Sequence, residues 1–192
     1  MLPEVIQVIM LVVEAFDRLQ TRYFISGSVA SALHGVTRST IDADLVAEIE
    51  PNQVSELINL LGAGFYADEE MILDAIRHRS SFNFVHLNTM YKVDVFLRKE
   101  RPFEDAQFRR REEQVFSTEP DQKAFVATAE DTILAKLEWY RMGGEVSDRQ
   151  WRDILGVLKV QADRLDRDYL QEWALELGVS DLLEKAQKEA EE

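Results

Sequence analysis

The sequence contains no cysteine, which excludes disulfides, zinc–thiolate sites, iron–sulfur clusters and cysteine nucleophiles. Glycine (8) and proline (4) are also scarce among the 192 residues, and 46% of the chain is hydrophobic, as in a packed globular protein. No apolar run approaches the roughly 18 residues of a membrane span. Met1–Leu19 lacks the basic leader of a signal peptide. We therefore expect a cytoplasmic protein that does not act at a membrane, with one domain and at most a small appendage.

Basic residues are few as well. The chain carries 22 Lys and Arg against 36 Asp and Glu, a net charge of −14. A field of that sign repels polyanions, so broad nonspecific binding to DNA or RNA is not expected. The one basic concentration is interleaved with acidic residues, and we interpret it as a solvated surface; a site for an acceptor's phosphates is the alternative. Its members are Arg77, Arg79, Arg98, Lys99, Arg101 and Arg109–Arg111.

Several common catalytic patterns are missing from the sequence. There is no Gly-x₄-Gly-Lys phosphate loop and no Ser-His-Asp order. His34, His78 and His86 lack the spacing of metal ligands. The chemistry must therefore be sought in other residues.

Hydrophobic periodicity predicts a mixed α/β region over residues 1–127. Helical spacing is found in Pro3–Leu19, Val29–His34, Pro51–Leu61 and Glu69–Ile76. Strands are predicted at Tyr23–Ile25, Ile41–Val46, Phe82–Leu87 and Tyr91–Leu97, with a weaker pair at Gln114–Phe116 and Lys123–Val126. No helix or strand is predicted in the charged segment Arg98–Glu113.

Residues 128–192 are predicted to be helical throughout. Thr128–Asp131 resembles a helix N-terminus, and the helix that follows is broken at Met142–Gly144. Ser147–Gln150 is a capping box for the next helix. Two further helices are predicted at Asp166–Leu177 and Asp181–Ala190. The fold class is therefore α/β (α+β), with a mixed β-sheet flanked by helices and a C-terminal helical bundle packed on it.

Three aspartates on predicted strands are the candidate chemical groups. Asp42 and Asp44 lie two residues apart, so both carboxylates share one face of their strand while Ile41, Ala43 and Leu45 face the core. Asp94 repeats the pattern on a later strand, with Lys92 on its own face. Carboxylates that converge in this way suit Mg²⁺ or Mn²⁺ and two-metal phosphoryl transfer. The alternative is the water-exposed face of an antiparallel sheet, where such alternation is common.

A possible anion site precedes the acidic pair. The predicted strand before Gly27-Ser28 opens there into a helix, and a helix N-terminus offers free backbone N–H groups to phosphate. A tight turn without a ligand is the simpler interpretation of Gly-Ser alone. Arg38 adds a cation just ahead of Asp42.

Taken in order, these motifs resemble the DNA polymerase β-type nucleotidyltransferase superfamily. The matching residues are Gly27-Ser28, then Arg38-x-Thr40-x-Asp42-x-Asp44, then Asp94. The chain is most similar to a small bacterial group that includes abortive-infection toxins of the AbiE/AbiG kind. Glu130–Tyr140 and Ser147–Ile154 are similar to helical motifs of that group, so residues 20–160 match in order.

The resemblance implies a role for each matching residue. Asp42 and Asp44 would bind the catalytic metals, and Asp94 would complete the metal site and help to activate the acceptor hydroxyl. The triphosphate of an NTP would be contacted by Gly27, Ser28, Arg38, Thr40 and Lys136. Asp153 would help to hold the helical part, with Arg149 one turn earlier as its partner.

The reaction implied is transfer of a nucleoside monophosphate from an NTP to an acceptor hydroxyl. RNA, protein or a small molecule remain open as acceptors, and the acidity of the chain favours a small cationic one such as an aminoglycoside. A toxin of this kind would have a cognate antitoxin as partner. A nucleotide-binding or partner-binding protein without turnover is the remaining alternative.

Overall fold

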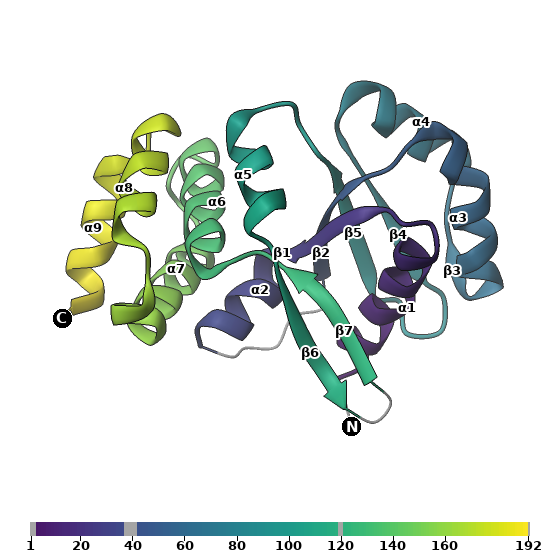
Figure 1. The fold of residues 1–192 in the computed structure, drawn as a ribbon, viewed down its shortest axis with the longest axis horizontal. Coiled ribbons are helices and arrows are strands. Elements are labelled where there is room, and N and C mark those ends of the chain that lie inside the picture. Colours follow the sequence, from purple (N-terminus) through teal and green to yellow (C-terminus); the bar gives the residue numbers. More distant parts are fainter. Residues whose placement is uncertain (1–2, 37–41, 119–120, 192) are drawn as a thin grey trace. The chain divides into compact units, whose positions relative to one another are not determined.

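The computed structural model describes residues 3–36, 42–118 and 121–191, and it contains two compact units (Figure 1). Within the described residues, the first unit comprises residues 3–26, 42–118 and 121–126. The second comprises residues 27–36 and 127–191. Each unit therefore combines segments that are distant in the sequence. No helix in the described segments is both long and apolar enough to cross a membrane.

The first unit is built on a mixed sheet of seven described strands in the order β3-β4-β5-β2-β1-β7-β6. β2 runs antiparallel to β1 and parallel to β5, so the sheet is mixed as expected. The strands are β1 (Arg22–Ser26), β2 (Asp42–Glu48), β3 (Phe65–Tyr66), β4 (Ser81–His86), β5 (Lys92–Leu97), β6 (Glu112–Thr118) and β7 (Asp121–Val126). The helices of this unit are α1 (Glu4–Arg18), α3 (Val54–Leu61), α4 (Glu69–His78) and α5 (Pro102–Arg110).

The two faces of the central strands differ in chemistry because side chains alternate along a strand. One face is fully apolar at its centre: Ala43, Leu45, Val93 and Val95 are all 0% exposed. α1 covers this face, and the rings of Phe16 and of Tyr23 in β1 contact each other at a tilt, with 5.6 Å between centroids. The other face carries the acidic residues of β2 and β5, which are half-buried.

α5 covers one end of this second face. Phe108 of α5 packs edge-on against Phe24 of β1 at 5.0 Å between ring centroids. The guanidinium of Arg98 lies 5.6 Å from the Phe108 ring. α5 was not predicted from the sequence, because its buried face includes Glu104 and Gln107 and so shows no apolar stripe.

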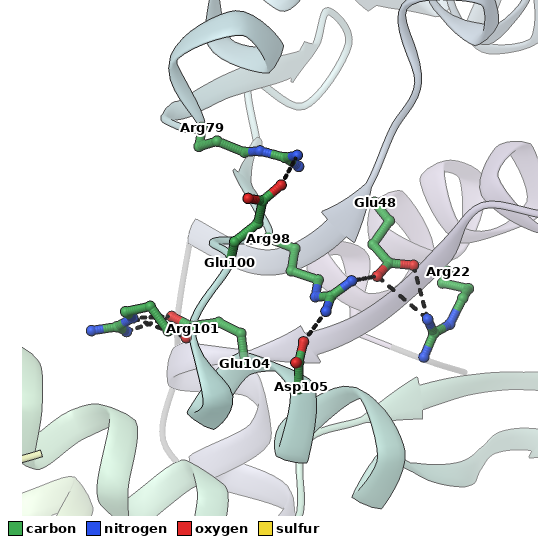
Figure 2. Close-up of polar contacts among 8 residues, drawn as sticks. All are labelled: Arg22, Glu48, Arg79, Arg98, Glu100, Arg101, Glu104 and Asp105. Atoms are coloured by element: carbon green, nitrogen blue, oxygen red, sulfur yellow. Dashed lines mark hydrogen bonds and ion pairs between the residues drawn. The ribbon is translucent and has the colours of Figure 1, made fainter. Parts of the chain in front are cut away.

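A chain of ion pairs fastens α5 to the strands (Figure 2). Arg98, which follows β5, lies between Glu48 of β2 and Asp105 of α5 and binds both carboxylates. Glu48 also binds Arg22 of β1, with 3.1 Å between the charged atoms. Other arginines of the basic concentration are paired in the same way: Arg79 binds Glu100 and Arg101 binds Glu104. Basic and acidic residues are thus interleaved as expected, but Glu104 is buried and Arg98 is partly buried, so the segment is less exposed to solvent than the sequence suggested.

The second unit is a bundle of helices, drawn in green to yellow in Figure 1 except for the earlier segment α2. α7 packs on α2, α6 and α9, and α8 packs on α6 and α9. Its helices are α2 (Gly27–His34), α6 (Ala129–Met142), α7 (Asp148–Gln161), α8 (Arg167–Glu176) and α9 (Ser180–Glu191). The predicted C-terminal helices are thus present, with boundaries shifted by a few residues.

The place of α2 differs from the sequence-based division at residue 127, which grouped it with the sheet. α2 contacts α6 and α7, and its end is fixed by polar contacts within the second unit. His34 Nε2 lies 2.7 Å from the Ala127 carbonyl oxygen, and Gln161 Nε2 donates to the His34 carbonyl oxygen at 2.6 Å. Such contacts between distant segments cannot be inferred from local periodicity.

Gly35→Ala is expected to lower the stability of this unit by about 1–3 kcal/mol, the usual cost of overpacking. A Cβ at Gly35 would lie 2.8 Å from the Val157 nitrogen and 2.9 Å from the Gly156 carbonyl carbon, both backbone atoms of α7. Thermal unfolding checks this, with Gly64→Ala as control because a Cβ at Gly64 meets no atom within 4 Å. Equal melting temperatures for the two variants would contradict the close approach of α2 and α7.

Candidate functional site

Strand pairing brings the three predicted carboxylates onto one face of the sheet. β2 and β5 are parallel neighbours, and in their register Asp44 stands opposite Asp94 while Asp42 stands opposite Lys92. Side chains at paired positions lie side by side on the same face. We call Asp42, Asp44 and Asp94 the acidic cluster. The sequence predicted its members but not this register, since the strands are separated by two helices and two strands.

The acidic cluster is accompanied by a cation. Lys92 Nζ lies 2.9 Å from Asp94 Oδ2, and the two side chains are 42% and 22% exposed. The hydrogen bond with Asp94 holds the pKa of the Lys92 ammonium above its usual value, and the negative charges of Asp42 and Asp44 add to that effect, although partial burial opposes it. Lys92 therefore stays protonated and offsets part of the negative charge.

Asn83 is a further polar group beside the acidic cluster. It stands opposite Asp94 in the antiparallel pairing of β4 with β5 and is half-buried. The sequence analysis did not single it out. It could have been found from the predicted hairpin of these two strands, because the register of a hairpin decides which residue stands opposite Asp94.

Divalent cations such as Mg²⁺ and Mn²⁺ prefer oxygen ligands, so the donor chemistry of the acidic cluster fits them. In the described part of the chain, no group of three or more Asp, Glu or His side chains is arranged to hold one metal ion. The contact that Asp94 makes is with Lys92 instead.

The turn after β1 carries the second group of residues that the sequence analysis singled out. Ser26, the last residue of β1, stands opposite Asp44, and Gly27 follows it in the chain as the first residue of α2. Gly27 has φ of 58°, in the left-handed region that glycine adopts without strain. Its carbonyl oxygen accepts a hydrogen bond from Ser31 Oγ at 2.6 Å. The backbone thus turns sharply from strand to helix, as the Gly-Ser pattern predicted.

Arg149 lies near this turn within the second unit. Its guanidinium approaches the Ser28 hydroxyl at 3.5 Å, a long contact between exposed side chains. Arg149 was expected to pair with Asp153. The structure shows a contact of Asp153 with Lys136, whose Nζ donates to Asp153 Oδ2 at 2.9 Å.

The Lys136–Asp153 pair is buried between α6 and α7, with side-chain exposures of 10% and 7%. The N-terminus of α6 carries further buried acids with defined partners. Asp131 accepts a hydrogen bond from the Tyr169 hydroxyl at 2.7 Å, and Glu130 accepts one from the Asp166 backbone nitrogen at 2.9 Å. These contacts tie α6 to the neighbouring helices.

Two of the predicted phosphate-binding residues, Arg38 and Thr40, lie outside the described residues. The remaining candidates fall in two groups. Asp42, Asp44, Asp94 and Lys92 belong to the first unit, and Gly27, Ser28, Lys136, Arg149 and Asp153 belong to the second.

No protein-family model matches the sequence. Neither does any curated protein. Several solved structures resemble the chain, among them two that match over nearly its whole length. An antigenic nucleotidyltransferase-like protein from Paracoccidioides brasiliensis gives a TM-score of 0.59 at 19% identity, covering 96% of this chain and 92% of its own.

The second is the antibiotic-resistance factor ANT(2'')-Ia, with a TM-score of 0.56 at 14% identity and 97% of each chain covered. At such identities the likeness concerns the fold, and the particular resemblance to the AbiE/AbiG toxin-like group stays a prediction. Mixed sheet, flanking helices and structural neighbours together show that this chain has a nucleotidyltransferase-like fold.

Proposed function

We propose that the protein is a metal-dependent nucleotidyltransferase that moves a nucleoside monophosphate from an NTP to an acceptor hydroxyl. The observation that carries the proposal is the pairing of Asp42-x-Asp44 with Asp94 on one face of parallel strands, in a chain with a nucleotidyltransferase-like fold. The β1–α2 turn at Gly27 begins directly after the residue opposite Asp44. This combination is more specific than an acidic strand alone.

In the proposed reaction the acceptor oxygen forms a bond to the α-phosphorus of the NTP. The bond from that phosphorus to its bridging oxygen breaks, and pyrophosphate leaves. Asp94 would receive the hydroxyl proton, and Asp42 and Asp44 would hold the cation. Bound Mg²⁺ or Mn²⁺ would supply charge stabilisation of the phosphate oxygens.

The β1–α2 turn would bind the phosphates. Backbone N–H groups at Gly27 and Ser28 suit a triphosphate, and Arg149 adds a positive charge next to the Ser28 hydroxyl. Arg38 and Thr40 keep the phosphate-binding roles that the resemblance implies. For Lys136 we propose a different main role, because its ammonium is buried against Asp153: it joins α6 to α7.

Calorimetric titration with each of the four NTPs, with and without Mg²⁺, tests the proposal. We expect saturable binding that needs Mg²⁺, and a loss of at least about tenfold in affinity in Asp44→Ala, because one lost interaction of 1.4 kcal/mol already weakens binding tenfold. The preferred base would emerge from the same titrations. Absence of binding to all four NTPs would contradict the enzymatic proposal and favour a partner-binding protein with this fold.

A small cationic acceptor is the more specific form of the proposal. The net charge of −14 attracts cations and repels RNA, and one structural neighbour is an antibiotic-resistance factor. The protein is incubated with the preferred NTP and with an aminoglycoside, an RNA or a protein mixture. The acceptor class is the one that becomes labelled with the nucleotide. Labelling of RNA or protein alone would overturn the small-molecule assignment.

A toxin role is the finer alternative implied by the resemblance. It predicts that expression of the chain arrests bacterial growth and that Asp44→Ala relieves the arrest. A cognate antitoxin would then restore growth with the wild-type chain. Normal growth on overexpression, with no partner encoded beside the gene, would contradict a toxin role and leave the transfer reaction open.

A further inference from the structure

Lys92 occupies an unusual position among the carboxylates of the acidic cluster. It shares the face of β5 with Asp94, two residues away, and stands opposite Asp42 in the parallel pairing with β2. Its ammonium lies 2.9 Å from the Asp94 carboxylate. The positive charge is therefore held by the first unit's own sheet, on the face that carries all three acids.

The charges explain why a cation is needed there. Three carboxylates on adjacent positions of paired strands repel one another, and like charges directly opposite, such as Asp44 and Asp94, destabilise a sheet. Asp42 and Asp44 both act on the Lys92 ammonium through their charges, in addition to its hydrogen bond with Asp94. Lys92 thus offsets a repulsion that a bound divalent cation would also offset.

A divalent cation bound at the acidic cluster would compete with Lys92 for the carboxylate of Asp94. Asp94 Oδ2 accepts from Lys92 Nζ, so this oxygen is engaged before any metal arrives. The pair is partly exposed, which makes it weak enough to exchange, since exposed ion pairs contribute little to stability. The long, flexible lysine stem allows the ammonium to move away without moving the strand.

We propose that Lys92 is an internal counter-ion of the acidic cluster, which a divalent cation displaces from Asp94 when it binds. The inference rests on the proposed function, since it concerns the same metal centre. It makes Lys92 a positioning residue that weakens metal binding and stabilises the sheet when no metal is bound.

Titration with Mn²⁺, followed by calorimetry or electron paramagnetic resonance, tests this in the full-length protein without nucleotide. Lys92→Met keeps the apolar stem and removes the charge, and we expect it to bind Mn²⁺ about fivefold or more tightly than the wild type. Lys92→Arg retains a cation beside Asp94 and should stay near the wild-type affinity. Lys123→Met is the matched control, because Lys123 is a strand lysine of the same unit with a side chain 43% exposed.

The second measurement is the melting temperature of each variant in the presence of EDTA. Lys92→Met should melt at a lower temperature than the wild type there, and saturating Mn²⁺ should raise its melting temperature by more than it raises that of the wild type. In an Asp94→Asn background the effect of Lys92→Met on Mn²⁺ affinity should shrink, because the contact under test is already lost.

The outcomes separate the two proposals. Equal Mn²⁺ affinity in wild type and Lys92→Met, with binding lost in Asp44→Ala, would overturn the counter-ion role and leave the metal centre intact. An equal gain in Lys123→Met would show that overall charge, not the Asp94 contact, sets the affinity. Failure of every variant to bind Mn²⁺ would overturn the metal centre itself and the counter-ion role with it.

Discussion

Asp42→Asn combined with Asp44→Asn is expected to reduce nucleotidyl transfer by about 100-fold or more while leaving the melting temperature unchanged or higher. Removing a preorganised charge contact at a reacting phosphate typically costs this much in rate. Stability should not suffer, because both side chains are half-buried on a face where three carboxylates repel one another. Loss of activity with retained stability is the pattern of a functional site rather than a structural one.

The measurement compares initial rates of pyrophosphate release with thermal unfolding of the same preparations. Glu113→Gln with Asp121→Asn is the matched control, because it removes two negative charges from exposed positions on β6 and β7 of the same unit. The control should keep wild-type activity. A marked fall in melting temperature for the Asp42/Asp44 variant, together with an inactive wild type, would mean that the acidic cluster has a structural role only.

Lys136→Ala is expected to destabilise the protein by about 3–5 kcal/mol, because it removes the ammonium from a buried ion pair with Asp153. The two side chains are only 10% and 7% exposed. Replacing both residues, with Lys136→Met and Asp153→Leu, should restore most of the stability, since an apolar pair of similar volume avoids the cost of desolvating charges. Urea denaturation measures both changes.

The control for this prediction is an exposed ion pair. Arg18 and Glu14 are 62% and 59% exposed, and Arg18→Ala should cost less than about 1 kcal/mol. The double variant at Lys136 and Asp153 also separates two roles of Lys136. If it is stable and binds NTP as the wild type does, Lys136 is structural; a stable variant with weakened NTP binding would assign it to the phosphates. A small effect of Lys136→Ala would contradict the buried pair.

The sequence predicted most of the strands and helices because their apolar residues recur at the right period. β5 was expected at residues 91–97 and runs from Lys92 to Leu97, and α1 was expected at residues 3–19 and runs from Glu4 to Arg18. α5 was not predicted, because its apolar residues do not recur at helical spacing. Pro102 in its first turn was the one sequence feature that favoured a helix there. When a helix buries charged and polar residues, its buried face cannot be recognised from the spacing of apolar residues.

The sequence indicated which residues form the candidate site, but it did not indicate most of the contacts between them. Strand alternation placed Asp42 and Asp44 on one face, but the pairing of Asp44 with Asp94 depends on tertiary packing of strands far apart in the chain. The contact between Asp153 and Lys136 was not predicted, for a similar reason. Spacing within α7 favours Arg149, whereas Lys136 reaches Asp153 from another helix.

The discontinuous second unit has a consequence for synthesis on the ribosome. α2 is made early, but the helices that cover it, α6 and α7, are encoded more than ninety residues later. At about 5–20 residues per second of translation, α2 waits roughly 5 to 25 seconds for these partners. The Gly27 turn is therefore among the first parts of the proposed site to be translated and among the last to acquire its packing. Nascent chains stalled before residue 161 would carry α2 without the complete α7 that packs on it.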